Sequence, residues 1–422
     1  MAKNNSLPDS NSAIKWRLLL TVMLVAVTLV MVSACSSATD TARSKPKKST
    51  PSPSATTLLY DPVPLLAKVL VEKMPLEDKV AQMFMVTPEA LLHRSQKVVA
   101  AGEPAQQAFE RRPVGGVILN TANLQSPEQV KTMSSELQEY SQARVGIPLF
   151  IAVDEEGGTV ARVSGNSAMG IKPYPNMREV GARKDPKRAL EIGTEMGEYL
   201  ANLGFNIDFA PDVDVLTNSK NDLLKDRAFG SDARTVTKMA AAFSKGLQTS
   251  GVLATYKHFP GHGSTSTDTH KEVTISQRNA RQLERVDLVP FKDAVANNIK
   301  VVMVSHVSFP KVVGNDTPAS LSKKLVTGWA REKLKYQGVL ITDSMRMGAI
   351  SNNYQPAEAA VMAVAAGNDI VLDPQDFEAA YQGVLAALNS GQISEDQINQ
   401  SVSRIVATKL RLASADDRSN GR

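Results

Sequence analysis

The segment GVLATYKHFPGHGSTSTDTH, residues 251–270, decides the interpretation of this chain. Its first part, Gly251–Tyr256, is an apolar run of strand length. Its second part, Lys257–His270, holds three of the five histidines of the chain, together with glycines and a proline. A buried strand that ends in a loop rich in glycine and ionisable groups is typical of α/β enzymes, which carry catalytic groups at such positions.

Similar apolar runs recur along the chain and alternate with segments of helical length. The predicted strands are Gln82–Thr87, Gly116–Asn120, Leu149–Asp154, Asn206–Pro211, Leu253–His258, Val301–His306, Val339–Asp343 and Asp369–Asp373. The predicted helices include Pro127–Arg144, Lys187–Leu203, Ala233–Gln248, Pro356–Ala366 and a last helix, Gln392–Leu412. This alternation indicates an α/β domain over residues 58–412 that forms a single (β/α)8 TIM-like barrel. An open doubly wound sheet is the alternative, but no G-x-G-x-x-G fingerprint follows the first strand.

The N-terminus has the pattern of an export signal. Lys15 and Arg17 precede an apolar run, Leu18–Val32, that is shorter than the roughly 20 residues needed to span a membrane. Small residues and the only cysteine, Cys35, follow. The pattern resembles a bacterial lipobox, and the resemblance implies a lipoprotein signal peptide over residues 1–34, cleavage before Cys35 and a lipid on its thiol. An uncleaved signal anchor with a chance cysteine is the alternative.

The segment after Cys35 is rich in Ser, Thr, Pro and Lys and has few large apolar residues. Such a composition cannot bury enough surface to fold, so residues 35–57 are predicted to form a lipidated, disordered tether. Residues 413–422 are predicted to be a polar tail. We therefore expect an exported monomer, anchored to the outer face of the bacterial cell membrane as a lipoprotein.

The net positive charge of the chain arises from its N-terminal part. The net charge is +5, and residues 1–50 carry seven basic and two acidic residues, which leaves 41 residues of each sign in the remainder. The charge of the folded part therefore gives no support to nucleic-acid binding, and we expect no nucleic-acid partner. A single cysteine excludes an intramolecular disulfide, so the domain must be stabilised by its core.

Ionisable or polar residues follow most of the predicted strands. Because a parallel barrel carries its active site at the carboxyl ends of its strands, we expect these residues to form one ring around the mouth. They are Asp154, Glu155, Glu156, Asp212, Asp214, Lys257, His258, Ser305, His306, Asp343 and Asp373. A solvated loop position is the alternative for each of them taken singly.

Three residues in this region are candidates for catalysis. Asp343 ends a strand and could be a nucleophile or a charge stabiliser, although a helix N-cap is the alternative role. Asp268 and His270 are two residues apart, so in an extended segment they share a face, and the carboxylate can orient and charge the imidazole for acid/base work. Lys257 and His258 are adjacent, and at least one of them should face the mouth.

A metal site is a competing interpretation of the same loop, since His258, His262, Asp268 and His270 are all of ligand type. The spacing of the first two histidines would suit a helix, but a proline and a glycine lie between them and disfavour it. We therefore expect neither a metal nor another cofactor.

Together these residues resemble glycoside hydrolase family 3, in particular its single-domain β-N-acetylglucosaminidases. The family patterns K-H-F-P-G-H-G with D-x-H, D-x-E-G-G…R, R-x-F-G and [ST]-D match Lys257–His270, Asp154–Arg162, Arg227–Gly230 and Thr342–Asp343. The resemblance spans about residues 65–412. The chain departs from the family at Glu155, Thr159 and Ser344, where glutamine, arginine and a second aspartate are common.

The resemblance implies a retaining exo-β-N-acetylglucosaminidase that acts on terminal β-linked N-acetylglucosamine through a glycosyl-aspartate intermediate. It implies Asp343 as nucleophile and His270, held by Asp268, as acid and base. The implied sugar-binding residues are Asp154, Arg162, Arg227, Lys257 and His258. The implied substrate is an N-acetylglucosamine-containing glycan or muropeptide from peptidoglycan. A β-N-acetylglucosaminide phosphorylase, a non-catalytic sugar-binding surface lipoprotein and a metallohydrolase are the alternatives.

Overall fold

A computed structural model describes residues 61–266, 268–269 and 272–420, with the backbone alone over 414–420. The predicted signal peptide, Cys35 and the predicted tether lie outside the described residues, and so does His270. None of the helices described is long and apolar enough to cross a membrane.

Eight parallel strands form the central sheet, in the order β11-β9-β7-β6-β3-β2-β1-β12. They are β1 (Phe84–Val86), β2 (Gly116–Ile118), β3 (Phe150–Val153), β6 (Ile207–Asp208), β7 (Leu253–Phe259), β9 (Val301–Val304), β11 (Val339–Thr342) and β12 (Val371–Leu372). A parallel bridge between Ile341 and Ile370 joins the two ends of this order, and the Thr342 amide donates to the Ile370 carbonyl at 3.0 Å. The sheet therefore closes into a barrel, and the predicted (β/α)8 fold is confirmed.

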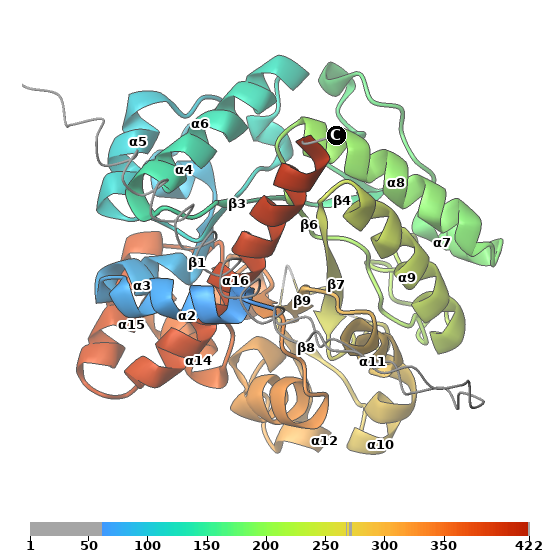
Figure 1. Cartoon of the computed structure of the whole chain (residues 1–422). Coiled ribbons are helices and arrows are strands. Elements are labelled where there is room, and N and C mark those ends of the chain that lie inside the picture. Colours follow the sequence, from blue (N-terminus) through green and yellow to red (C-terminus); the bar gives the residue numbers. More distant parts are fainter. Residues whose placement is uncertain (1–60, 267, 270–271, 421–422) are drawn as a thin grey trace, which may run out of the picture. The chain divides into compact units, whose positions relative to one another are not determined.

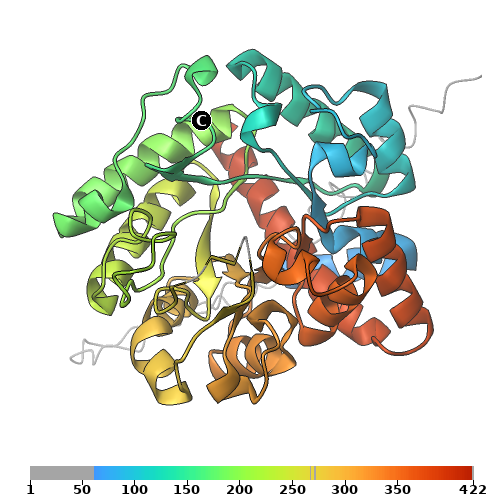
Figure 2. The same ribbon diagram turned by 180° about the vertical axis from the view of Figure 1, so that it is seen from behind.

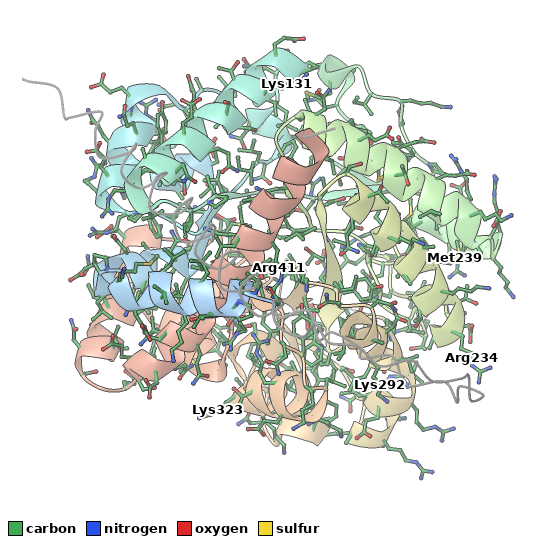
Figure 3. All side chains as sticks on the ribbon, in the orientation of Figure 1. Lys131, Arg234, Met239, Lys292, Lys323 and Arg411 are labelled. Atoms are coloured by element: carbon green, nitrogen blue, oxygen red, sulfur yellow. The ribbon has the colours of Figure 1, made fainter. Side chains whose placement is uncertain are left out.

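Helices surround the barrel, as Figures 1 and 2 show from opposite sides. The longer ones are α2 (Val63–Lys73), α3 (Leu76–Gln82), α5 (Gly102–Arg111), α6 (Pro127–Val145), α8 (Pro186–Asn202), α9 (Ala233–Thr249), α11 (Val289–Ala296), η5 (Lys324–Lys333), α14 (Pro356–Ala366), α15 (Phe377–Asn389) and α16 (Glu395–Asn420). Their outer faces are polar: Lys131 on α6 and Arg234 on α9 are exposed (Figure 3).

Shorter elements lie in the connections. They are α4 (Pro88–Leu91), η1 (Thr121–Asn123), β4 (Glu155–Gly157), β5 (Val160–Ala161), η2 (Ser167–Met169), α7 (Met177–Ala182), β8 (Thr274–Ile275), α10 (Ala280–Gln282), η3 (Leu283–Asp287), β10 (Val307–Ser308), α12 (Pro310–Val313), η4 (Ala319–Leu321) and α13 (Gly348–Ser351). Of these, the hairpin β4–β5 and helix α13 follow strands that carry site residues.

The helix boundaries follow from local chemistry. The side chains of Ser126, Asp232 and Asp376 accept hydrogen bonds from the first turns of α6, α9 and α15, which satisfies amides that have no partner within the helix. Gly146 and Gly367 end α6 and α14 with φ angles of 71° and 109°, a conformation that favours glycine. These caps fix where each helix turns back toward the next strand.

The core consists of the barrel interior and the layer between strands and helices. All seven residues of β7 are buried, as are the strand residues of β3, β9 and β11. Burying one large apolar side chain stabilises a fold by about 1.5–3 kcal/mol, so this layer holds the strand ends firmly in place.

The last helix, α16, packs against α2, α3 and β11. It extends to Asn420, beyond the predicted end at Leu412, so the residues predicted to be a polar tail are helical up to that point. Propagating a helix that is already anchored requires only one further residue to be ordered at each step, and the alanines of this segment favour it.

Candidate active site

Four of the predicted site residues lie at the carboxyl ends of β3, β7 and β11. Asp154 directly follows β3, Lys257 and His258 belong to the end of β7, and Asp343 directly follows β11. A separate cavity of about 800 Å³ lies at the opposite end of the barrel, between α2, α11 and α16, and none of the predicted site residues lines it. The chemistry of this molecule is therefore concentrated at the carboxyl-terminal mouth.

Four charged side chains form a network at the mouth. Lys257 Nζ lies 2.8 Å from Asp154 Oδ1 and 2.6 Å from Glu156 Oε1. Arg227, in the loop between β6 and α9, binds Glu156 with both Nε and a terminal nitrogen, each at 2.8 Å. Lys257, Glu156 and Arg227 are buried, whereas the side chain of Asp154 is 22% exposed and brings the network to the surface. Two cations and two anions balance one another here.

The neighbouring charges favour the ionised forms of Glu156 and Lys257. Burial alone would raise the pKa of Glu156, but the charges of Arg227 and Lys257 outweigh it and hold the pKa below its ordinary value. Burial would lower the pKa of Lys257, but Asp154 and Glu156 outweigh it and raise that pKa. The ionised state of each of these two buried groups is therefore stabilised by its oppositely charged neighbours.

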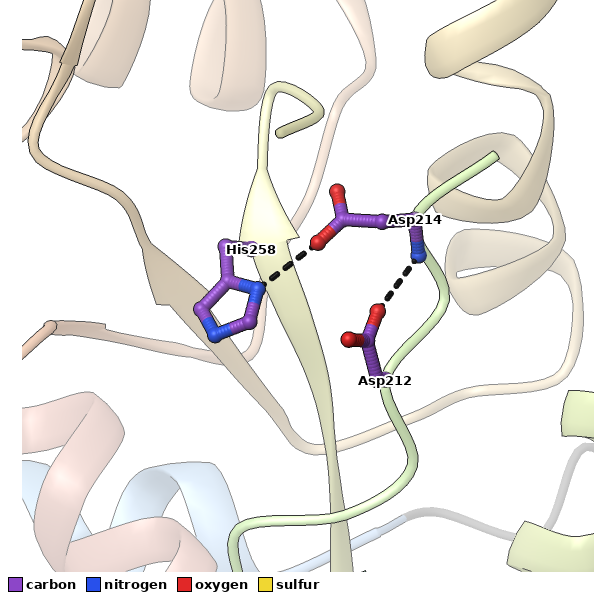
Figure 4. Close-up of side chains that lie close together, drawn as sticks. All are labelled: Asp212, Asp214 and His258. Atoms are coloured by element: carbon purple, nitrogen blue, oxygen red, sulfur yellow. Dashed lines mark hydrogen bonds and ion pairs between the residues drawn. The ribbon is translucent and has the colours of Figure 1, made fainter. Parts of the chain in front are cut away.

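His258 connects this network to two further carboxylates (Figure 4). Its Nδ1 lies 2.7 Å from Asp214 Oδ2, its Nε2 lies 3.3 Å from Arg227, and the Asp214 amide donates to Asp212 Oδ1. Burial, then the Arg227 charge, lowers the pKa of His258 to about 4, so the imidazole is neutral at pH 7. Burial raises the pKa of Asp212 to about 8 and that of Asp214 to about 6.

Asp212, Asp214 and His258 could also supply metal ligands, because one ligand atom of each lies within 4.8 Å of the others. The guanidinium of Arg227 argues against this use. It lies 3.3 Å from His258 Nε2, and its Nε lies 3.8 Å from Asp212 Oδ2, so a divalent cation would meet a fixed positive charge. The arrangement suits a hydrogen-bonded network better than a metal centre.

Asp343 is half-buried at the end of β11. Its amide donates to the Val304 carbonyl at 2.9 Å, and its Oδ1 accepts the Ser344 amide at 2.8 Å. It does not cap a helix: the next helix, α13, starts at Gly348 with Met347 at the cap position. The charge of Asp343 acts on both His258 and His262, so the carboxylate lies in the vicinity of these two imidazoles. His306 holds the following residue, with Nε2 2.9 Å from the Ser344 carbonyl.

The loop after β7 approaches the neighbouring loops closely because of two glycines. Gly261 has a φ angle of 130°, and a Cβ there would lie 2.5 Å from the Cβ of Asp287. A Cβ on Gly263 would lie 2.1 Å from the Val215 carbonyl oxygen. Larger residues would push the loop away from the mouth. Asp268 is partly buried in this loop, and its predicted partner His270 lies outside the described residues.

The expected ring needs one correction, at Glu155. Its carboxylate faces away from the network and accepts hydrogen bonds from Val163, from both the amide and the hydroxyl of Ser164, and from Tyr199. Successive residues of a strand point to opposite sides, so only Glu156 of the pair reaches the mouth. Glu155 has a structural role in closing the β4–β5 hairpin.

One predicted binding residue stays outside the network, and two partners within it were not predicted as site residues. Arg162 follows β5 and is half-buried, but it makes no ion pair within the described part of the chain. Glu156 and Asp214, the partners of Arg227 and His258, were predicted only as members of the ring and not as site residues. Acidic residues two positions after another acid, as in 154–156 and 212–214, were the available signal.

Comparison with known proteins gives a consistent result. The family model for the glycosyl hydrolase family 3 N terminal domain matches residues 75–408. Beta-hexosaminidase A of Pseudoalteromonas piscicida is 32% identical over 72% of this chain and 55% of its own length. Beta-hexosaminidase LpqI of Mycobacterium tuberculosis is 32% identical over 79% of this chain and 82% of its own length.

A solved structure with the same fold is that of a glycoside hydrolase family 3 beta-N-acetylglucosaminidase from Paenibacillus sp. FPU-7. It superposes with a TM-score of 0.75 at 37% identity, over 81% of this chain and 63% of that chain. The chain thus spans little more than half the length of the first of these relatives and under two thirds of this structure.

Proposed function

The chain belongs to glycosyl hydrolase family 3, and from this premise we propose that it is a retaining exo-β-N-acetylglucosaminidase. The observation that carries the proposal is the position of Asp343 at the carboxyl end of β11, where its charge acts on His258 of the same mouth. The beta-hexosaminidase names of the relatives support the same reaction.

The network suits a neutral sugar. Its two cations and two anions cancel, and His258 is neutral, so the four-residue network offers directed donors and acceptors with no net charge of its own. Hydrogen bonds that involve an ionised group are stronger than neutral ones, which favours selective binding of hydroxyl and acetamido groups. Asp154, Arg162, Arg227, Lys257 and His258 are the residues proposed to bind the terminal N-acetylglucosamine.

In the first step, an oxygen of Asp343 attacks the anomeric carbon while the bond to the leaving oxygen breaks. His270, oriented by Asp268, donates its proton to that oxygen, which leaves as an alcohol. The Ser344 amide, 2.8 Å from Asp343 Oδ1, fixes the orientation of the nucleophile. In the second step, His270 takes a proton from water, the water oxygen attacks the anomeric carbon, and the bond to Asp343 breaks.

The natural substrate that we propose is a peptidoglycan fragment with a terminal N-acetylglucosamine. The support is the apolar segment Leu18–Val32 followed by Cys35, which is typical of an exported lipoprotein. A lipid on Cys35 would keep the enzyme on the outer face of the membrane, where cell-wall fragments are available.

If the anchor is correct, Cys35→Ser moves the protein from the membrane fraction to the soluble fraction of cells. Retention of that variant in the membrane fraction would contradict the anchor.

The test of the reaction is the release of 4-nitrophenol from its β-N-acetylglucosaminide and its β-glucoside. We expect cleavage of the first alone, without added phosphate, and a loss of about 10⁴-fold or more in Asp343→Ala, because removing a nucleophile removes the covalent route. Dependence on phosphate would favour the phosphorylase. Binding of N-acetylglucosamine without cleavage by a folded protein would favour the sugar-binding lipoprotein, and loss of activity on chelation would favour a metallohydrolase.

A further inference from the structure

His262 is a fully buried histidine for which the reaction has no direct use. It is 1% exposed, and its amide donates to Asp214 Oδ1 at 2.5 Å. Its ring bridges two points of its own loop: Nδ1 lies 2.7 Å from Thr265 Oγ1, and Nε2 lies 3.4 Å from Thr269 Oγ1. The imidazole therefore spans the loop from its start to the residue that follows Asp268.

The hydrogen bonds determine which ring nitrogen carries the proton. Thr265 Oγ1 donates its only proton to the His262 carbonyl at 2.9 Å, so it can only accept from Nδ1. In a neutral imidazole the other nitrogen is then an acceptor, so Nε2 accepts the hydroxyl proton of Thr269. Burial, followed by the influence of His258, lowers the pKa of His262 to about 3, so the neutral form persists at pH 7.

Thr269 is the residue through which this contact reaches the reaction. It is 1% exposed and stands in the sequence between Asp268 and His270. Its carbonyl accepts the Ala349 amide at 3.1 Å, and Ala349 belongs to α13, the helix that follows Asp343. Thr269 is thus held by His262 on one side and by the segment after the nucleophile on the other.

The start of the loop is itself fixed. Asn221 donates to the His262 carbonyl at 3.2 Å and to Thr265 Oγ1 at 3.3 Å, and Asn218 donates to the Thr265 carbonyl at 3.0 Å. The imidazole therefore has a rigid base from which to hold Thr269. A hydrogen bond from a rigid base restricts a neighbouring group more than one from a mobile side chain does.

We propose that His262 is a positioning residue, which holds the backbone next to Asp268 of the proposed acid/base pair through its hydrogen bond with Thr269. The inference rests on the proposed function for the roles of Asp268 and His270. In this role His262 acts on the reaction only through Thr269 and does not touch the substrate. The His262–Thr269 contact links the acid/base side of the reaction to the side that carries the nucleophile.

The test compares Thr269→Val, which keeps the side-chain shape without the hydroxyl, with Thr269→Ser, which keeps the hydroxyl. Values of kcat/KM are measured on aryl β-N-acetylglucosaminides that differ in the pKa of the phenol. We expect Thr269→Val to lower kcat/KM about tenfold for phenols that need protonation and less than about twofold for 2,4-dinitrophenol, which needs none. Thr269→Ser and the wild-type protein should behave alike. Equal losses on both substrate classes, or no loss, would overturn the proposal.

A second pair of measurements separates this inference from the proposed function. Hydrogen exchange of peptides that cover residues 262–272 and 345–351 is followed in the full-length protein. We expect faster exchange in Thr269→Val and in His262→Asn, which can replace Nδ1 but not Nε2, and wild-type exchange in Thr269→Ser. Unchanged exchange in both disrupted variants would overturn the positioning role whatever the activity. An inactive wild-type protein would instead overturn the proposed function and leave the exchange result to decide the role of His262.

Discussion

At the scale of single residues, Lys409 of α16 is a lysine buried at the amino-terminal end of the barrel. Its Nζ lies 2.7 Å from Gln82 Oε1 and 5.1 Å from the centre of the Phe150 ring. Within the part of the chain that the structure describes, no carboxylate forms an ion pair with it. Burial therefore lowers the pKa of Lys409 to about 7.

This lysine should make the stability of the fold depend on pH. In the unfolded chain lysine titrates near about 10.4, so between about pH 7 and about pH 10 the unfolded state binds more protons than the folded state. The free energy of unfolding should therefore rise with pH in that window, by up to about 1.4 kcal/mol per pH unit from this group. Lowering the pH from about 10 to about 7 should remove this contribution.

The measurement is urea unfolding across that window for the wild type, Lys409→Met and the exposed control Lys238→Met. We expect the pH dependence to be flatter in Lys409→Met alone, because methionine fills the same space without a charge. Parallel curves for all three proteins would show that Lys409 does not titrate there.

The site residues show what a sequence can predict at this scale. Lys257, His258 and Asp343 were predicted because they end apolar strands, and the structure places all three at the mouth. Their partners were harder to predict, because Glu156 and Asp214 differ from Glu155 and Asp212 only in which way each side chain points. That direction depends on strand pleat and loop path, which a single sequence does not reveal.

At the scale of elements, helices α8 and α9 touch through glycines. A Cβ on Gly193 would lie 2.1 Å from the Phe243 carbonyl oxygen, and one on Gly246 would lie 2.5 Å from that of Leu190. These contacts are with backbone, which cannot swing aside as a side chain could. The close approach of the two helices therefore requires glycine at both positions.

Gly193→Ala should lower the free energy of unfolding by about 1–3 kcal/mol, the usual cost of overpacking. Gly328 in η5 is the matched control, since the nearest atom to a Cβ there is 4.0 Å away. Gly328→Ala should be neutral or stabilise the fold by about 0.4–1 kcal/mol through the lower entropy of the unfolded chain. Chemical unfolding midpoints compare the two, and a wild-type midpoint for Gly193→Ala would mean that the helices can separate without cost.

All eight strands and the helices α6, α8, α9, α14 and α16 were predicted from the sequence, because the period of apolar residues differs between the two kinds of element. The strand boundaries were less accurate: the observed β6 and β12 have two residues each, within longer predicted segments. Apolar composition continues past the last backbone pairing, so it overestimates strand length. The extension of α16 to Asn420 was missed for the opposite reason, since its last residues are polar.

At the scale of the whole domain, the residues with a structural role and the residues of the candidate active site lie at opposite ends of the barrel. Lys409 and the ion pairs of Asp369 with Arg331 and Arg404 lie near the amino ends of the strands, whereas the network of Asp154, Lys257 and their partners lies at the carboxyl ends. A closed barrel gathers residues from Asp154 to Asp343 around one mouth, although they are far apart in the sequence. This explains why a ring of site residues could be predicted before the individual contacts were known.

The measurement that tests the account most directly is the trapping of the glycosyl-enzyme. A fluorinated N-acetylglucosaminyl fluoride forms the covalent intermediate but slows its hydrolysis, and peptide mass spectrometry then locates the sugar. We predict one N-acetylglucosaminyl group per chain, attached to Asp343, and none in Asp343→Ala. A label on a different residue, or no label on folded and active wild-type protein, would contradict the proposal that Asp343 is the nucleophile of a retaining enzyme.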